Sequence, residues 1–405
     1  MKRLLLVVVA CVSMPASAAT YHMLSEIYNV REPQPAPCTL GTCADYALGM
    51  RISGSFTTAA PLAANLAPAE ISPLITAYSF TDGIHTYAST DPDARNITFT
   101  VGTDGAGDVS FALAALQRWQ AAGPHVAGNR LDAIIISPGV VQAATNRSCD
   151  VVGPSPGTGV ADSCNDFTDD ADTSIAASQF GVTWRTGAPV PVPALAPSTF
   201  TFRSASYETI INHTTCTIGI CADYTPAMRV TASLTTVDRL PPNLSDVFLS
   251  GYLSSFSFND GVRTITSSDP EVAFFGAFLD TDAASGIGTG HLLVVARWQT
   301  AGPHVVGDRV DFIGAQSGRA FVISNVPCTA IGVSPLALAG PVCLSFDTND
   351  PNASLASTES LRAWLLAAEA SGVVAVPALN GWVRLALALL LALAGAIALR
   401  APRRR

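Results

Sequence analysis

The sequence predicts an all-β protein made of two tandem homologous antiparallel β-sandwich or barrel domains, followed by a C-terminal transmembrane helix. Three observations lead to this fold class. One long segment occurs twice, the body of the chain alternates short apolar-polar segments with turn residues, and each end carries a long apolar run. Alternation with a period of two is typical of half-buried strands, and many short strands separated by turns are typical of antiparallel sandwiches and barrels.

Residues 1–18 have the order of a cleavable signal peptide. Lys2 and Arg3 precede an apolar run from Leu4 to Val12, and the small residues Ala16-Ser17-Ala18 follow. Basic, hydrophobic and small-residue regions in this order direct secretion. We therefore expect the rest of the chain to be exported.

The body of the chain contains one long repeat. Residues 38–53 read CTLGTCADYALGMRIS and residues 216–231 read CTIGICADYTPAMRVT, 178 positions later. After a one-residue insertion the offset becomes 179, and it still holds where Cys164 corresponds to Cys343. Solenoid units span only about 20–50 residues, so a repeat of this length indicates a duplicated domain.

The repeat sets the domain boundaries. We place the first β domain at residues 19–186 and the second at residues 199–370. Residues 187–198 form a Pro/Ala linker, in which prolines at alternate positions favour an extended spacer.

Strands are expected at matching places in the two repeats. Residues 50–57 alternate apolar and polar side chains. Asp82-Gly83 and Asp260-Gly261 lie between β-prone segments, which predicts a hairpin in each repeat. Further strands are expected at residues 96–101, 109–119 and 131–136 of the first repeat and at residues 277–280, 291–298 and 310–313 of the second.

The cysteines indicate disulfide bonds. Cys11 lies in the signal peptide, and the other eight fall at matching positions, four in each repeat. An even, duplicated set in a secreted chain predicts a disulfide framework. Three pairings are open in each repeat, and we favour the local ones: Cys38 with Cys43, Cys149 with Cys164, Cys216 with Cys221, and Cys328 with Cys343. A metal site at the C-x4-C pairs is the alternative, although structural zinc sites use closer pairs and need two more ligands.

Charge and composition exclude several classes of function. Seven of the 22 basic residues lie in the two terminal segments, which leaves 15 against 31 acidic residues and a net charge of −16 for the exported part. Such a surface repels phosphate backbones, so we expect no nucleic-acid partner. Lys2 is the only lysine, which excludes Schiff-base chemistry and Walker-type phosphate binding in the mature protein.

The C-terminal segment predicts a membrane helix. Leu385 to Leu399 is an unbroken apolar run, with Trp382 and Arg384 before it and four arginines after it. About 15 helical residues reach only about 22 Å of the roughly 30 Å hydrocarbon layer, so flanking residues must help to span it. The basic end is expected to stay in the cytoplasm, with the body of the protein outside. A plain membrane anchor explains these features as well.

Residues 376–382, the apolar run and the arginine tip together resemble the IPTL-CTERM sorting signal, a relative of PEP-CTERM. The family motif is Ile-Pro-Thr-Leu-x-x-Trp, and its positions here are Val376, Pro377, Ala378, Leu379 and Trp382. Arg384, just inside the expected start of the helix, departs from the pattern. The resemblance implies a Gram-negative bacterium, an exosortase-like sorting protease as partner, and delivery to the cell surface or to the exopolysaccharide matrix. The duplicated body also looks like uncharacterised passengers of such tails.

Four duplicated residues are candidates for ligand binding. Trp119 and Trp298 lie in predicted strands, where core packing and sugar stacking are the two alternatives. His125 and His304 recur in Gly-Pro-His, each followed by an Arg and an Asp, namely Arg130 and Asp132 or Arg309 and Asp311. Such a set suits acid–base work or ligand binding, but it also suits a turn that pairs across a sheet edge.

Acidic clusters near the last cysteine of each repeat are candidates for weak calcium sites. Their oxygen ligands are Asp162, Asp166, Asp169, Asp170 and Asp172 in the first repeat and Asp347, Asn349 and Asp350 in the second. The EF-hand pattern is absent, so a solvated acidic loop is the default and no metal or cofactor is assigned.

The combined patterns favour a non-catalytic protein of the cell surface or extracellular matrix, with a structural or adhesive role. Gly153–Gly157 fits the nucleophile pattern G-x-S-x-G, but two prolines in a cysteine-closed loop do not make a strand-turn-helix elbow, and the second repeat has no equivalent serine. The alternative is a carbohydrate-binding module for exopolysaccharide. A hydrolase built from residues distant in sequence is the third class.

Overall fold

The computed structural model describes residues 17–32, 37–249, 251–284, 286–333, 341–359 and 364–366. Nearly all of the predicted signal peptide, residues 1–18, lies outside these ranges, and so does the predicted sorting segment 376–405. Among the described residues, no helix has both the length and the apolar character needed to cross a membrane.

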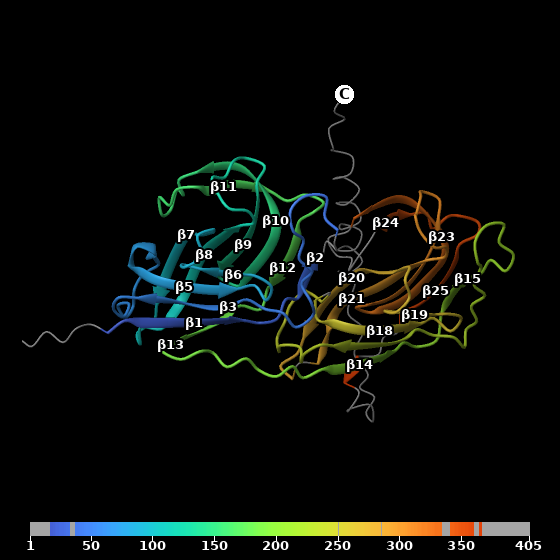
Figure 1. Cartoon of the computed structure of the whole chain (residues 1–405). Coiled ribbons are helices and arrows are strands. Elements are labelled where there is room, and N and C mark those ends of the chain that lie inside the picture. Colours follow the sequence, from blue (N-terminus) through green and yellow to red (C-terminus); the bar gives the residue numbers. More distant parts are fainter. Residues whose placement is uncertain are drawn as a thin grey trace, which may run out of the picture. The chain divides into compact units, whose positions relative to one another are not determined.

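The described chain is all-β and divides into two compact units (Figure 1). The first unit contains most of residues 19–193, and the second contains the described residues from 194 onward. Each unit holds a smaller sheet of five strands and a larger sheet of eight, and the central strands of both sheets pair antiparallel. No sheet in the described part of the chain closes on itself, so of the two predicted alternatives the barrel is wrong.

The first unit has two sheets and one short 3-10 helix, Ser72–Leu74. The smaller sheet has the order β13 (Val182–Thr186), β1 (Ala19–Ser25), β3 (Ser53–Thr58), β5 (Ile75–Thr81), β6 (Thr86–Ala88). The larger sheet has the order β2 (Val30–Glu32), β12 (Ser174–Ser178), β10 (Val140–Gly153), β9 (Arg130–Ser137), β8 (Val109–Trp119), β7 (Ala94–Thr103), β4 (Ala69–Glu70), and β11 (Ser163–Thr168) pairs with β10.

The second unit repeats this order strand for strand. Its smaller sheet runs β19 (Thr264–Thr266), β18 (Leu253–Asn259), β16 (Thr231–Thr236), β14 (Ser198–Arg203), β26 (Leu365–Leu366). Its larger sheet runs β15 (Thr209–Ile211), β25 (Ser354–Thr358), β23 (Arg319–Val333), β22 (Arg309–Gln316), β21 (Ile287–Trp298), β20 (Val272–Thr281), β17 (Val247–Phe248), and β24 (Pro341–Phe346) pairs with β23.

Aromatic rings fill the space between the two sheets of each unit. In the first unit the ring centroid of Phe99 on β7 lies 4.8 Å from that of Phe56 on β3 and 6.0 Å from that of Phe80 on β5. In the second unit Phe274 on β20 lies 4.5 Å from Phe256 on β18. Inward-facing side chains from two sheets therefore make one core per unit, as in a β-sandwich.

Most of the predicted strands are present. The hairpins at Asp82-Gly83 and Asp260-Gly261 join β5 to β6 and β18 to β19. The strand expected at residues 50–57 begins only at Ser53. Ile52 is fully buried, but its amide donates to Ser25 Oγ at 3.0 Å instead of entering a ladder, so burial alone produced the apolar signal there.

We expect Phe99→Ala to destabilise the first unit by about 3–5 kcal/mol, because the substitution opens a cavity where the two sheets meet. Urea unfolding followed by tryptophan fluorescence measures the loss. Val126→Ala is the matched control, since the Val126 side chain is mostly exposed and its truncation should change little. Equal unfolding curves for the two variants would contradict the proposed core.

Candidate functional site

The four predicted disulfides are present. Cα atoms of the paired cysteines lie 5.6–5.8 Å apart in Cys38–Cys43, Cys149–Cys164, Cys216–Cys221 and Cys328–Cys343. The bond with the longer loop joins β10 to β11 in the first unit and β23 to β24 in the second. Each therefore fixes a hairpin that extends from the larger sheet.

The predicted tryptophans pack beside these long-loop disulfides. Trp119 belongs to a buried cluster with Leu131, Ala133, Cys149 and Cys164. Its ring stacks on His125, with 4.1 Å between ring centroids and an interplanar angle of 8°. Its indole N–H donates to the carbonyl oxygen of Asp162 at 2.9 Å.

The second unit has the same stack between Trp298 and His304, at 4.1 Å and 10°. Trp298 packs in a cluster that contains Cys328 and Cys343. Trp119 and Trp298 are only 1% and 6% exposed, so neither ring has a free face for a sugar. For these two residues the structure shows core packing, the first of the two predicted alternatives.

Both histidines are held by internal acceptors. His125 Nδ1 lies 2.6 Å from Asp162 Oδ2, and its Nε2 lies 2.7 Å from the carbonyl oxygen of Ala121. His304 Nε2 lies 2.8 Å from Glu271 Oε2. Each histidine follows a cis proline. Its stacked and hydrogen-bonded ring fixes the turn after β8 or β21. The side chains of His125 and His304 are 1% and 6% exposed and contact internal acceptors, which is the turn role that the sequence offered as the alternative to ligand binding.

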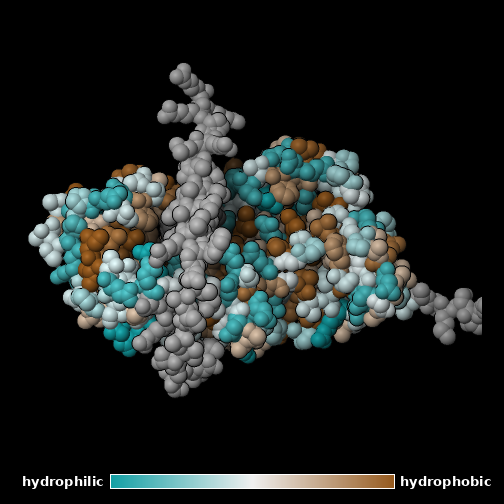
Figure 2. Space-filling model, turned by 180° about the vertical axis from the view of Figure 1, so that it is seen from behind, coloured by the Kyte–Doolittle hydropathy of each residue, from teal (hydrophilic) through white to brown (hydrophobic). Residues whose placement is uncertain are grey.

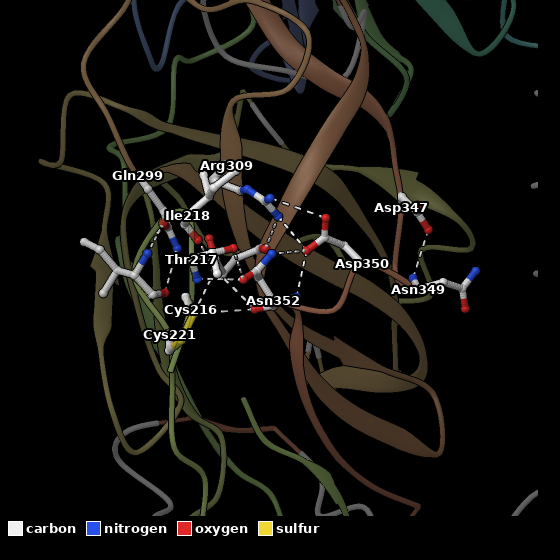
Figure 3. A network of polar contacts seen from close by, with 12 residues as sticks. Cys216, Thr217, Ile218, Cys221, Gln299, Arg309, Asp347, Asn349, Asp350 and Asn352 are labelled. Carbon is white, nitrogen blue, oxygen red and sulfur yellow. Dashed lines mark hydrogen bonds and ion pairs between the residues drawn. A yellow bond between two sulfur atoms is a disulfide. The ribbon is translucent and has the colours of Figure 1, made fainter. Parts of the chain in front are cut away.

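The acidic loop of the second unit holds the short disulfide loop in place (Figure 3). Asn352 Oδ1 accepts hydrogen bonds from the amide and the hydroxyl of Thr217, at 2.9 and 3.1 Å. Asp350 accepts from Asn352 and forms an ion pair with Arg309 at 3.0 Å. Gln299 brackets Ile220, accepting from its amide at 2.7 Å and donating to its carbonyl at 3.1 Å.

The first unit builds the same network with one change of residue. Asp172 stands where the second unit has Asn352, and it accepts from the amides of Thr39 and Leu40 at 2.9 and 3.1 Å. These contacts hold the pKa of Asp172 below its usual range, mainly through the Thr39 hydroxyl. Gln120 brackets Thr42 as Gln299 brackets Ile220.

Most of the candidate calcium ligands contact internal partners. Asp170 pairs with Arg130 at 2.8 Å, and Asp169 pairs with Arg147 at 2.6 Å. Asp347 accepts the amide of Asn349 in its own loop. In the part of the chain that the structure describes, no three His, Cys, Asp or Glu side chains are grouped as metal ligands.

The structure reveals a buried acid pair that sequence reasoning missed. Asp82 and Asp132 are both fully buried in the first unit. Tyr46 and Tyr87 donate their hydroxyls to Asp82 Oδ2 at 3.2 and 3.1 Å. His85 Nδ1 lies 3.7 Å from Asp82 Oδ2 and 3.5 Å from Asp132 Oδ2, between the two carboxylates.

This placement also separates the predicted His-Arg-Asp set. Asp132 accepts from Gln120 Nε2 at 2.8 Å, whereas Arg130 pairs with Asp170 and His125 with Asp162. His125, Arg130 and Asp132 lie close together in the sequence but contact three different partners. They therefore do not form one acid–base centre.

The second unit has a permanent cation where the first has a histidine. Arg263 occupies the position of His85 and forms an ion pair with Asp311, the equivalent of Asp132. Tyr224 donates to Asp260 Oδ2 at 2.8 Å, as Tyr46 does to Asp82. The only signal in the sequence was that Asp82 and Asp132 recur as Asp260 and Asp311. The sequence does not predict that the hairpin folds over these acids.

We expect Gly219→Ala to cost about 1–3 kcal/mol more stability than Gly318→Ala. Both glycines have positive φ, +76° and +81°, so the strain of the left-handed backbone is matched. A Cβ at Gly219 would lie 1.9 Å from Asn325 Oδ1, whereas a Cβ at Gly318 would meet no atom within 4 Å. Urea unfolding of the two variants measures the difference, and equal losses would contradict the close approach.

We expect the hairpin at Asp82 to lose protection as the pH rises above neutral. The Asp82 carboxylate, and then Asp132, raise the pKa of His85, with burial and Arg118 opposing. Because the folded pKa lies above the ordinary value of 6.5, the stabilisation is complete below that value and is lost as the pH rises through the raised pKa. Asp82, whose pKa is lowered, loses its stabilisation only in acid, outside this window.

Hydrogen exchange measures this effect at matched amides. Ile84 and His85 donate their amides to Asp82 Oδ1, and Val262 and Arg263 donate theirs to Asp260 Oδ1. Between about pH 6 and pH 8.5 the first pair should lose protection and the second should not, after correction for intrinsic rates. His85→Arg should abolish the pH dependence, and a dependence that persists would refute the assignment to His85.

The predicted sorting motif, Val376, Pro377, Ala378, Leu379 and Trp382, lies outside the described residues. The export and sorting predictions therefore stay predictions. Comparison of the chain with protein-family models, with curated proteins and with solved structures gives no match.

Proposed function

We propose that this chain is an exported, non-catalytic protein of the cell surface or extracellular matrix, with a structural or adhesive role. The observation that carries the proposal is the set of four disulfides at matched positions in the two units. Disulfides persist in oxidising compartments outside the cytosol. A chain that depends on four of them is suited to an exposed location.

The use of the duplicated polar residues supports a structural role. The Trp-His stacks, the bracketing glutamines and the paired acids all contact other parts of their own unit. In each unit the shared polar side chains thus stabilise loops and hairpins of that unit. Rigid, stapled modules in tandem are suited to a load-bearing or adhesive component.

The C-terminal pattern supports sorting by an exosortase-like system. The Pro-x-Leu-x-x-Trp spacing, the apolar run and the arginine tip occur in the order that such a protease recognises, as the resemblance implies. In this proposal the tail holds the protein transiently in the inner membrane until the protease acts near the motif.

Expression of the full chain in a Gram-negative host that carries such a protease tests the proposal. The native chain should reach the surface with no free thiol among its eight body cysteines, as measured by thiol labelling after denaturation. Pro377→Ala combined with Leu379→Ala should leave the protein uncut in the membrane fraction, while Val373→Ala, outside the motif, should be sorted normally.

Two outcomes would refute separate parts of the proposal. Free thiols and a cytosolic location would remove the export and the surface role. Normal sorting of the motif variant would leave export intact and reduce the tail to a plain membrane anchor.

A further inference from the structure

The larger sheet of the second unit has apolar side chains on both faces. Leu293, Val295 and Ile313 are at most 1% exposed. Val295 pairs in register with Ile313 and with Phe274, whose ring contacts Phe256 of the smaller sheet, so this set of side chains faces the smaller sheet. Their neighbours along the strands point to the opposite face, because side chains alternate in a strand. Those neighbours, Val294 and Phe312 among them, belong to a second buried cluster. A sheet with an apolar outer face needs a cover or a ligand.

The stapled hairpin of β23 and β24 covers only part of this face. Phe346 at the end of β24 packs on Phe312, with ring centroids 4.5 Å apart. Beyond that contact a cavity of about 340 Å³ remains, lined by Leu292, Phe312, Phe321, Ile323, Phe346 and Leu355 among other residues. In Figure 2 a brown, hydrophobic area lies over the part of the second unit where Figure 1 places β23 and β25. We call this cavity the outer groove.

The size and lining of the outer groove fit an acyl chain. Its volume lies near the lower end of the roughly 300–1,000 Å³ of small-molecule sites. A methylene group takes up a volume similar to that of a water molecule, about 30 Å³ in the liquid, so the groove has room for about ten carbons. Its walls are aliphatic and aromatic, which favours hydrocarbon over water.

A cation stands at the edge of the outer groove. Arg319 lines it, is exposed, and forms no ion pair with any described residue. Its guanidinium carbon lies 5.7 Å from the centroid of the Phe321 ring, at the boundary between the polar rim and the apolar wall. A guanidinium at this place is suited to a carboxylate, which it can bind through two parallel hydrogen bonds.

The first unit lacks these features at the equivalent positions. With the offset of 179, Phe312 corresponds to Ala133, Phe321 to Gln142 and Arg319 to Val140. The fold forms without Phe312, Phe321 and Arg319 at these three positions, so the scaffold does not require them. This difference points to a role that only the second unit has.

We propose that the outer groove binds a single-chain fatty-acid carboxylate, with the acyl chain against Leu292, Phe312 and Phe321 and the carboxylate on Arg319. The proposal goes beyond the structural role and does not depend on it. It assigns to the second unit a lipid-binding activity that the first unit does not share.

Photo-crosslinking of the full chain in membranes tests the proposal, with decanoate that carries a diazirine near its methyl end as probe. Crosslinks should map by mass spectrometry to peptides of β21, β22 and β23 and not to β8, β9 and β10. Unlabelled decanoate should compete them away. Arg319→Val, which introduces the residue of the first unit at an exposed position, should reduce labelling about tenfold, the loss expected for one charge-assisted contact.

A neutral probe and a second variant separate the contribution of the apolar wall from that of the arginine. Phe321→Gln should reduce labelling by decanoate and by the neutral diazirine decanol, whereas Arg319→Val should reduce only the former. Val305→Gln removes an exposed apolar side chain outside the groove and should change neither. Equal labelling of the two units, labelling that does not saturate, no labelling, or labelling unaffected by Arg319→Val would each overturn the proposal.

Discussion

The need to cover the outer face of the larger sheet is the constraint on which most of this structure depends. In both units that sheet is apolar on two sides, and the smaller sheet buries only one of them. The other side is covered by a hairpin that extends from the sheet, and a hairpin of two strands has little stability of its own. The long-loop disulfide and the buried tryptophan stabilise the hairpin. The histidine that stacks on the tryptophan fixes the adjacent turn.

The two units keep this scaffold while their charges diverge. Asp162 and Glu271 come from different parts of the repeat, yet each holds the stacked histidine of its unit. Asp172 and Asn352 occupy one position and hold the short disulfide loop in the same way, because both offer an oxygen acceptor to a backbone amide. At the buried acid pair, His85 is replaced by Arg263, which makes the charge permanent. The two units thus share the arrangement of these contacts. They differ in the charged and titratable residues that make them.

The residues that both units share and the residues that only the second unit has differ in what they contact. The polar residues that both units share contact other parts of their own unit, and with the disulfides they stabilise its loops and hairpins. Phe312, Phe321 and Arg319, which only the second unit has, lie where the hairpin cover stops. The two halves thus share a scaffold and differ in the residues on the outer face of the larger sheet.

The sequence by itself determined the all-β class, the two-fold repeat and both hairpins, because these follow from local periodicity and turn residues. It favoured the four disulfide pairs among three pairings per repeat, and the structure has those pairs. Only the tertiary structure decided that Trp119 and Trp298 face a disulfide and a histidine instead of solvent. It also brought Asp82 and Asp132 together and opened the groove beside Phe312. Which side chains are buried, and which ones meet in space, depends on which strands become neighbours. Pairing between strands that are distant in sequence leaves no local pattern in the chain.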